Sequence, residues 1–168
     1  VWNHDGTKLA FASNRFGNFD IFIVSADGGS PTRLTYHSAQ DFPSSFTRDG
    51  KSVLFQSARL DDSKSVQFPY AGLTELYSVS TEGGREKQYL TIAAEDVQFN
   101  ATGTQLLFQN RKGYEDPWRK HHTSSVTRDI VLYNSETKKF TQITDWKGED
   151  RNPVWGENDE IYFLSEKS

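Results

Sequence analysis

The sequence predicts an all-β fold built from repeated units of four antiparallel strands, and two general observations favour this class. Aromatic residues make up 14% of the 168 residues, and aromatic side chains prefer the half-buried surface of a β-sheet. Apolar and polar residues alternate along short segments, whereas no segment keeps helical periodicity over the roughly twelve residues that a helix needs. An internal repeat then indicates how the strands are arranged.

A twelve-residue segment recurs along the chain. Its copies occupy residues 2–13, 46–57 and 99–110, and a looser copy occupies residues 155–165. Successive copies begin 44, 53 and 56 residues apart. Self-similarity on this scale is typical of proteins that stack one structural unit repeatedly.

Each copy is predicted to form two strands joined by a tight turn. Asp-Gly between two apolar runs is the strongest short hairpin signal, because glycine readily takes the positive φ that the turn requires. The first two copies have this pair at Asp5-Gly6 and Asp49-Gly50, and the third copy keeps only Gly103. The last copy has Glu157-Asn158 instead.

Two further strands follow each of the first three copies. The predicted third strands are residues 20–24, 75–79 and 129–133. Turns follow at residues 27–29, 82–84 and 135–137, and the short fourth strands end in residues 33–35, 89–91 and 142–144. Each complete unit therefore contains four strands.

Such a unit cannot bury both of its faces alone, and four strands per repeat of about 40 to 50 residues are typical of a β-propeller blade. We predict a β-propeller fragment of three four-stranded antiparallel blades and half of a fourth. The predicted blades cover about residues 1–42, 43–95, 96–151 and 152–168. A β-sandwich of unrelated strands is the alternative, but the periodic aromatic-Asp-Gly and Leu-Thr signals count against it.

Composition limits the partners. The net charge of −4 and pI of about 5.6 provide no basic surface for nucleic acid, and no apolar run is long enough to cross a bilayer. There are no cysteines and therefore no thiolate metal sites. The chain has no Met and begins within a repeat, so we expect part of a longer protein whose open blade faces permit self-association.

Two connections are longer than the repeat requires. Between the predicted second and third strands, the first unit has only residues 15–18, whereas the second has residues 58–74 and the third has residues 111–128. In a propeller these connections share a face with the fourth-to-first connections. Long loops on a rigid scaffold often carry function, so we expect the functional site there.

The insertion in the third unit carries the candidate peptide-binding residues. Arg offers a planar fork and Lys a point charge for a peptide carboxylate. The alternative is a surface loop that packs its Trp and Pro on the propeller and leaves its charges solvated. The candidate residues are Trp118, Arg119, Lys120, His121 and His122.

No catalytic residue, metal site or cofactor is predicted. Adjacent His121 and His122 would point to opposite sides of an extended segment, and no carboxylate has ligand spacing to them. Ser124 and Ser125 lack a nucleophile-elbow pattern and an orienting acid at a recognised spacing. We therefore expect this chain to be non-catalytic.

One aspartate precedes the first strand of each later unit. These residues are Asp41, Asp96 and Asp150. Recurrence at one structural position favours a role in the fold, in which each carboxylate holds the inter-blade turn through backbone amides. A polar ring at the mouth of the propeller channel is the alternative.

The repeat, which reads aromatic-x-x-Asp-Gly-x-x-Leu-x-Phe-x-Ser and continues with Asp-Ile-Phe, Gly-Gly and Arg-Leu-Thr, resembles the TolB-type propeller repeat. Residues 15–22, 74–79 and 118–129 more closely resemble the N-terminal propeller of bacterial tricorn-like serine peptidases. That resemblance implies a non-catalytic propeller that guides or gates peptides, or mediates protein interactions, ahead of a downstream serine-protease core.

The same resemblance implies a periplasmic or otherwise extracytoplasmic location, with the cytoplasm as the alternative. Two other functions remain open from the repeat. One is a TolB-like periplasmic propeller that binds proteins, and the other is the propeller of a prolyl-oligopeptidase-like enzyme. Each would be followed by different downstream segments.

Overall fold

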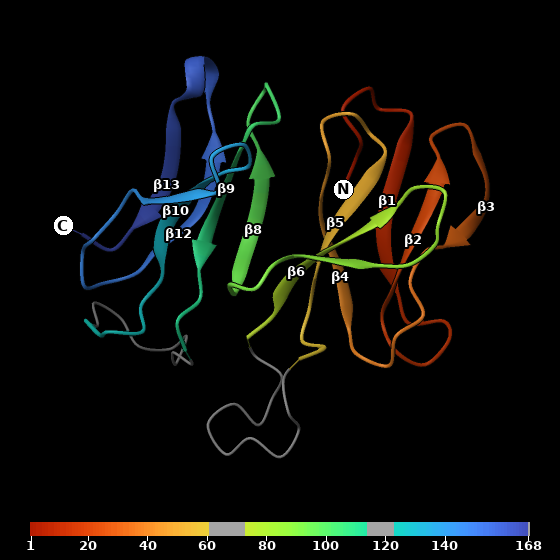
Figure 1. Cartoon of the computed structure of the whole chain (residues 1–168), viewed down its shortest axis with the longest axis horizontal. Helices are drawn as coiled ribbons and strands as arrows, with labels where there is room; N and C mark the ends of the chain where they lie inside the picture. The colour runs from red at the N-terminus through yellow and green to blue at the C-terminus, as the bar shows by residue number, and fades with distance from the viewer. Residues whose placement is uncertain (61–72, 114–122, 168) are drawn as a thin grey trace. The chain divides into compact units, whose positions relative to one another are not determined.

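The computed structural model describes residues 1–60, 73–113 and 123–167, in which the chain forms four antiparallel β-sheets (Figure 1). These sheets fall into two compact units, each of which holds two sheets and is larger than one repeat. Among the described residues, the first unit consists of residues 1–60 and 74–92, and the second consists of residues 73, 93–113 and 123–167.

The first unit holds two sheets in which neighbouring strands are consecutive in the chain. The first sheet has the order β1 (Lys8–Ser13), β2 (Asp20–Ser25) and β3 (Gly28–Arg33). An antiparallel bridge between Trp2 and Leu9 lies beside β1. The second sheet has the order β4 (Asp41–Phe46), β5 (Ser52–Ser57), β6 (Glu75–Ser80) and β7 (Lys87–Leu90).

The second unit repeats this pattern. A four-stranded sheet contains β8 (Ala94–Phe99), β9 (Gln105–Asn110), β10 (Asp129–Asn134) and β11 (Lys139–Gln142). A two-stranded sheet pairs β12 (Asp150–Trp155) with β13 (Ile161–Ser165). The four-stranded meanders have the topology of propeller blades, which confirms the predicted all-β fold class.

The expected glycine turn is present in the hairpin between β4 and β5. Gly50 has φ of 67°, and its amide donates to the Thr47 carbonyl at 2.8 Å. In the hairpin between β8 and β9, the Asn100 side-chain oxygen also accepts from the amides of Thr104 and Gln105, both at 3.0 Å. Thus a residue just before the turn supports it, in addition to the glycine.

The hairpin between β12 and β13 departs from this pattern. Trp155 pairs with Ile161, whereas Phe46 pairs with Val53, so the last hairpin is one residue shorter. Glu157–Asp159 form a short 3-10 turn, in which Asn158 has φ of 56°. No helix was predicted, and within the described segments none is long and apolar enough to cross a membrane.

The central strands are buried on both of their faces. Val53, Leu54 and Phe55 of β5 are all fully buried, and so are Leu106 and Phe108 of β9. Because these strands are covered on both faces, their sequences are continuous apolar runs and do not alternate between apolar and polar residues. In the first unit, residues from both sheets share one hydrophobic cluster.

The recurring Leu-Thr signal has a local structural cause. The Thr35 hydroxyl accepts a hydrogen bond from the amide of Ile21 at 3.0 Å, and Thr144 accepts from Ile130 at 2.9 Å. In these two sheets the threonine follows the last strand and satisfies an amide of the strand before it. Thr35 is fully buried, so its hydroxyl serves a donor that water cannot reach.

Candidate functional site

The predicted peptide-binding residues, Trp118 to His122, lie outside the described residues. What the structure describes is the base of their insertion. It consists of Arg111, Lys112 and Gly113 on one side and residues 123–128 on the other. We refer to these two segments as the insertion base.

Glu95 on β8 connects both sides of the insertion base. Its Oε1 lies 3.1 Å from Arg111 Nη1, and its Oε2 accepts from Arg128 Nε at 3.0 Å. Gln109 Nε2 donates to the same Oε2 at 2.9 Å. Arg128 also lies 3.3 Å from Glu149. One carboxylate therefore ties together the residues that enter and leave the insertion.

Three further contacts hold the insertion base against the sheet. Lys112 forms an ion pair with the buried Asp129 at the start of β10. The amide of Ser124 donates to the Lys147 carbonyl at 2.8 Å. Gly113 is buried, and a β-carbon at this position would lie 3.0 Å from Val126. The two sides thus pack directly on each other.

The pKa shifts in the insertion base favour the charged forms of Glu95 and Arg128. Burial alone would raise the pKa of Glu95, but hydrogen bonds from Arg128 and Gln109 and the Arg128 and Arg111 charges lower it overall. Burial acts to lower the pKa of Arg128, yet Glu95 and Glu149 raise it overall. Each cation has an acidic partner, so the base is suited to position the insertion rather than to bind a charged ligand itself.

The predicted equivalence of Asp41, Asp96 and Asp150 is wrong for Asp96. Asp41, Ala94 and Asp150 are the residues that pair with the last residue of the adjoining second strand. Asp96 lies in a bulge of β8 with φ of 54°, and its carboxylate accepts from Asn152 Nδ2 at 3.2 Å. β4, β8 and β12 each have six residues and a register shift, so counting back five residues from Phe46, Phe99 and Trp155 leads to Asp41, Ala94 and Asp150.

The predicted role of Asp41 also needs correction. Its carboxylate pairs with Arg59 Nη2 at 2.7 Å, rather than with backbone amides, among the residues that the structure describes. The backbone provides the link to the preceding sheet, because the Asp41 amide donates to the Phe19 carbonyl at 2.8 Å. Asp150 repeats this backbone link to Arg128 at 3.2 Å.

A second candidate site, which the sequence did not single out, lies at the β1–β2 connection. Arg15 lies over the Phe22 ring at 4.5 Å, and Phe16 stacks on Phe22 with 6.2 Å between ring centroids. Arg33 lies over Phe16 at 4.8 Å and over Tyr36 at 4.6 Å. We call these five residues the cation–aromatic ladder.

The ladder leads from the core to the surface. Phe22 is 2% exposed, whereas Phe16 is 62% and Tyr36 68% exposed. Arg33 is anchored by buried Asp20, whose Oδ2 lies 2.6 Å from its Nη2. The only sequence signal was an Arg-Phe pair in a minimal connection, because Arg33 and Tyr36 come from a different part of the repeat.

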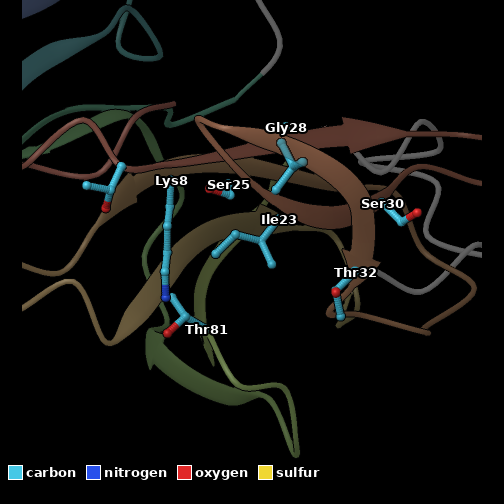
Figure 2. Close-up of a pocket in the computed structure, with 9 residues that line it drawn as sticks. Lys8, Ile23, Ser25, Gly28, Ser30, Thr32 and Thr81 are labelled. Carbon is cyan, nitrogen blue, oxygen red and sulfur yellow. The ribbon is translucent and has the colours of Figure 1, made fainter.

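A shallow pocket of about 310 Å³ lies beside β2 and β3 (Figure 2). Its lining includes the polar residues Lys8, Ser30, Thr32 and Thr81. In Figure 2 the Lys8 side chain extends toward Thr81, and Ile23 lies to one side of it. Hydroxyl groups with one ammonium can hydrogen-bond a polar ligand, but this pocket has no aromatic ring on which an apolar group would stack.

Comparison with known proteins identifies the fold. A family model described as the tricorn protease N-terminal β-propeller domain matches residues 2–168. The crystal structure of the tricorn protease superposes with a TM-score of 0.68 and 19% identity, covering 99% of this chain and 16% of that chain. A search of curated proteins found no significant match.

Propellers of other proteins are similarly close in structure. TolB from Acinetobacter baumannii matches with a TM-score of 0.63 and 16% identity, over 95% of this chain and 35% of its own. An oligogalacturonate lyase from Vibrio parahaemolyticus matches with a TM-score of 0.68 and 16% identity, over 97% and 44%. The chain thus spans less than half of each of these proteins.

Proposed function

Because the chain belongs to the family of tricorn protease N-terminal β-propeller domains, we propose that it is the non-catalytic propeller of a tricorn-like serine peptidase. In this proposal the propeller guides or gates peptides on their way to a protease core elsewhere in the parent protein. The insertion of the third repeat is the contact site, with Trp118, Arg119, Lys120, His121 and His122 as the peptide-binding residues.

The contacts that Glu95 makes with both sides of the insertion base are the observation that supports this use of the insertion. It joins Arg111 and Arg128, so the two ends of a long connection are held by one carboxylate at 3.1 and 3.0 Å. The cations of the base are matched by acidic partners, and the sequence places two further cations, Arg119 and Lys120, within the insertion. A loop fixed at both ends loses less conformational freedom when it binds a ligand, which favours affinity.

Peptide binding to the complete parent protein tests the proposal. We expect peptides with a free C-terminus to bind more tightly than amidated ones. Replacing both cations, Arg119→Gln with Lys120→Gln, should weaken binding about tenfold or more, because a charge-assisted hydrogen bond contributes about 1.5–3 kcal/mol. The matched control is Arg85→Gln with Lys87→Gln, at two exposed positions near β7. Equal affinity for free and amidated peptides would contradict the carboxylate anchor.

A TolB-like protein-binding propeller is the second candidate, supported by the structural likeness to TolB. The reading frame of the parent gene distinguishes the tricorn-like peptidase from the TolB-like binding module. A downstream serine-protease core supports the peptidase, and its absence, together with recovery of envelope proteins in a pull-down, supports the binding module. A downstream α/β-hydrolase domain would instead indicate a prolyl-oligopeptidase-like enzyme.

We place the parent protein in the periplasm or another extracytoplasmic compartment, as its resemblance to bacterial tricorn-like peptidases implies. Cell fractionation with an antibody to this propeller tests that location. Recovery in the cytoplasmic fraction alone would contradict it.

A further inference from the structure

We propose that Asp27 is a site of spontaneous backbone modification, at which the folded protein converts aspartate to isoaspartate. The chain has three Asp-Gly pairs, at Asp5-Gly6, Asp27-Gly28 and Asp49-Gly50. Such pairs are the most reactive aspartates of a chain, because glycine has no side chain to shield its amide nitrogen. The fold holds the carboxylates of two pairs and not that of the third. This inference is independent of the proposed peptide-handling function.

The reaction uses only these two residues and water. The amide nitrogen of Gly28 attacks Cγ of the Asp27 carboxylic acid, and the amide proton leaves with the carboxyl hydroxyl as water. The product is a five-membered succinimide. Water then adds to the succinimide carbonyl on the Cα side and breaks its bond to nitrogen. The chain is now joined through Cγ, with one more methylene in the main chain, a free α-carboxylate and an unchanged mass.

The turn that contains Asp49 holds its carboxylate in place. The Asp49 Oδ1 accepts from the Thr47 hydroxyl at 2.7 Å and from the Lys51 amide at 3.1 Å. These two hydrogen bonds lower the pKa of Asp49, so the carboxyl stays ionised. A carboxylate anion is a poor target for an amide nitrogen, and this one must also leave its donors to reach Gly50.

Asp5 is held in the same way. Its Oδ1 accepts from the Thr7 hydroxyl and from the Thr7 amide, the latter at 2.9 Å. Hydrogen bonds from the Thr7 side chain and backbone lower the pKa of Asp5 as well. Asp5 and Asp49 are equivalent residues of the repeated hairpin, so the same local structure protects both pairs.

Asp27 lies in a different turn, between β2 and β3, and its carboxylate has no such donor. The Asp27 amide donates to Ser25 Oγ at 3.2 Å, but the Asp27 side chain makes no hydrogen bond or ion pair within the described parts of the chain. Asp27 and Gly28 are both exposed. Gly28 and Gly29 have φ of 95° and 107°, and two adjacent glycines give the backbone freedom to bring the amide nitrogen onto Cγ.

The equivalent turn of the second sheet shows that this exposure belongs to the repeat. It contains Glu82, whose amide donates to Ser80 Oγ at 3.1 Å, followed by Gly83 and Gly84 with φ of 80° and 109°. Glu82 is exposed, although the first and second sheets share one hydrophobic cluster. The acidic residue is the difference that matters, because glutamate must form a six-membered ring, which closes far more slowly.

Isomerisation changes one wall of the pocket in Figure 2. Gly28 and Ser30 line that pocket, and Gly28 pairs with Ser25 across the β2–β3 hairpin. The added methylene lengthens the main chain just before Gly28 and so displaces this pair. The modified protein therefore keeps its mass and charge, whereas the geometry of its β2–β3 turn differs.

Peptide mapping of the aged parent protein tests the proposal. The folded protein is incubated at neutral pH, and mass spectrometry with electron-transfer fragmentation distinguishes isoaspartate from aspartate at each Asp-Gly pair. We expect isoaspartate to form at Asp27 about tenfold faster than at Asp49 or more, because Asp49 must first break hydrogen bonds to a charged group. In urea-unfolded protein the pairs should react at similar rates.

Asp27→Glu is the matched variant, because it reproduces the Glu-Gly-Gly turn that the second sheet already contains. It should show the circular dichroism spectrum of the wild type and form no isomer at position 27. Asp49→Glu should leave the rate at Asp27 unchanged. The proposal fails if the folded protein forms no isoaspartate at Asp27, or if Asp27 and Asp49 react equally fast in it. Neither result bears on peptide binding by the insertion.

Discussion

Glu95 illustrates how a single side chain can remain charged in a partly buried position. Two arginines and Gln109 surround its carboxylate, with donor distances of 2.9 to 3.1 Å. Their hydrogen bonds and charges outweigh the effect of burial and hold the pKa of Glu95 below its ordinary value of 4.5. The folded state therefore binds a proton at this site less readily than the unfolded state does.

This pKa shift predicts an acid-sensitive contribution to stability. A lowered folded-state pKa stabilises the fold above about pH 4.5, and the contribution is lost as pH falls through the folded-state value. Glu95→Gln should therefore lower the free energy of unfolding by about 2 kcal/mol near neutral pH. The free energy of unfolding of this variant should also change less with pH at acidic pH than that of the wild type. Urea unfolding from pH 3 to 7 measures this, with exposed Glu136→Gln as control. Parallel pH profiles for wild type and Glu95→Gln would contradict it.

At the scale of single elements, β3, the last strand of the first sheet, shows how a short sequence signal specifies structure. The β3 strand makes few pairs with β2, and the register shifts between Ile23 and Ser25. Thr35 compensates beyond the strand end, where its hydroxyl accepts from the Ile21 amide. The neighbouring amide of Leu34 donates to the Ile21 carbonyl at 2.8 Å.

Thr35→Val tests this compensation, because valine keeps the shape of threonine and removes only the hydroxyl. We expect a loss of about 1–3 kcal/mol, since the buried Ile21 amide loses its partner. Thr32→Val is the matched control at an exposed position of β3. Thermal unfolding compares the two variants, and equal melting temperatures would argue against the role of the hydroxyl.

The turns and strands were the most predictable elements. Asp-Gly pairs and alternating segments located the hairpins, because these signals depend on neighbouring residues alone. Asp96 was aligned with Asp41 because both are aspartates, although Ala94 lies five residues before Phe99 as Asp41 lies before Phe46. The register shifts in β4, β8 and β12 were not predicted. A bulge depends on how a strand pairs across the sheet and leaves no fixed mark in the sequence.

At the scale of the whole molecule, the chain forms two compact units, each with a buried central strand. The fold class followed from the repeat, but the cation–aromatic ladder did not, because folding brings Arg15 and Arg33 onto the same rings from separate strands. The blade limits, the role of Trp118 to His122 and self-association through open sheets stay predictions.

Phe55→Ala tests how stability is distributed between the units. Phe55 is fully buried in the cluster of the first unit, so the substitution should cost about 3–5 kcal/mol there. Because repeat proteins are stabilised mainly by near neighbours, amide-exchange protection should fall more in β5 than in β9. Phe108→Ala, at a fully buried position of β9, should reverse the order. Equal loss in both strands for either variant would indicate one cooperative unit.

The residues that end β3 and β11 make the same contacts with different chemistry. Gln142 Nε2 donates to Asp129 at 3.0 Å and to the Thr144 carbonyl at 2.8 Å, which are the contacts that Arg33 makes with Asp20 and Thr35. In the second unit Lys112 supplies the cation for Asp129 and Gln142 only donates hydrogen bonds, whereas Arg33 supplies both the donor and the cation for Asp20. Natural selection could therefore alter the donor or the cation of the second unit separately, whereas replacing Arg33 would leave buried Asp20 without the one cation that the described residues place beside it.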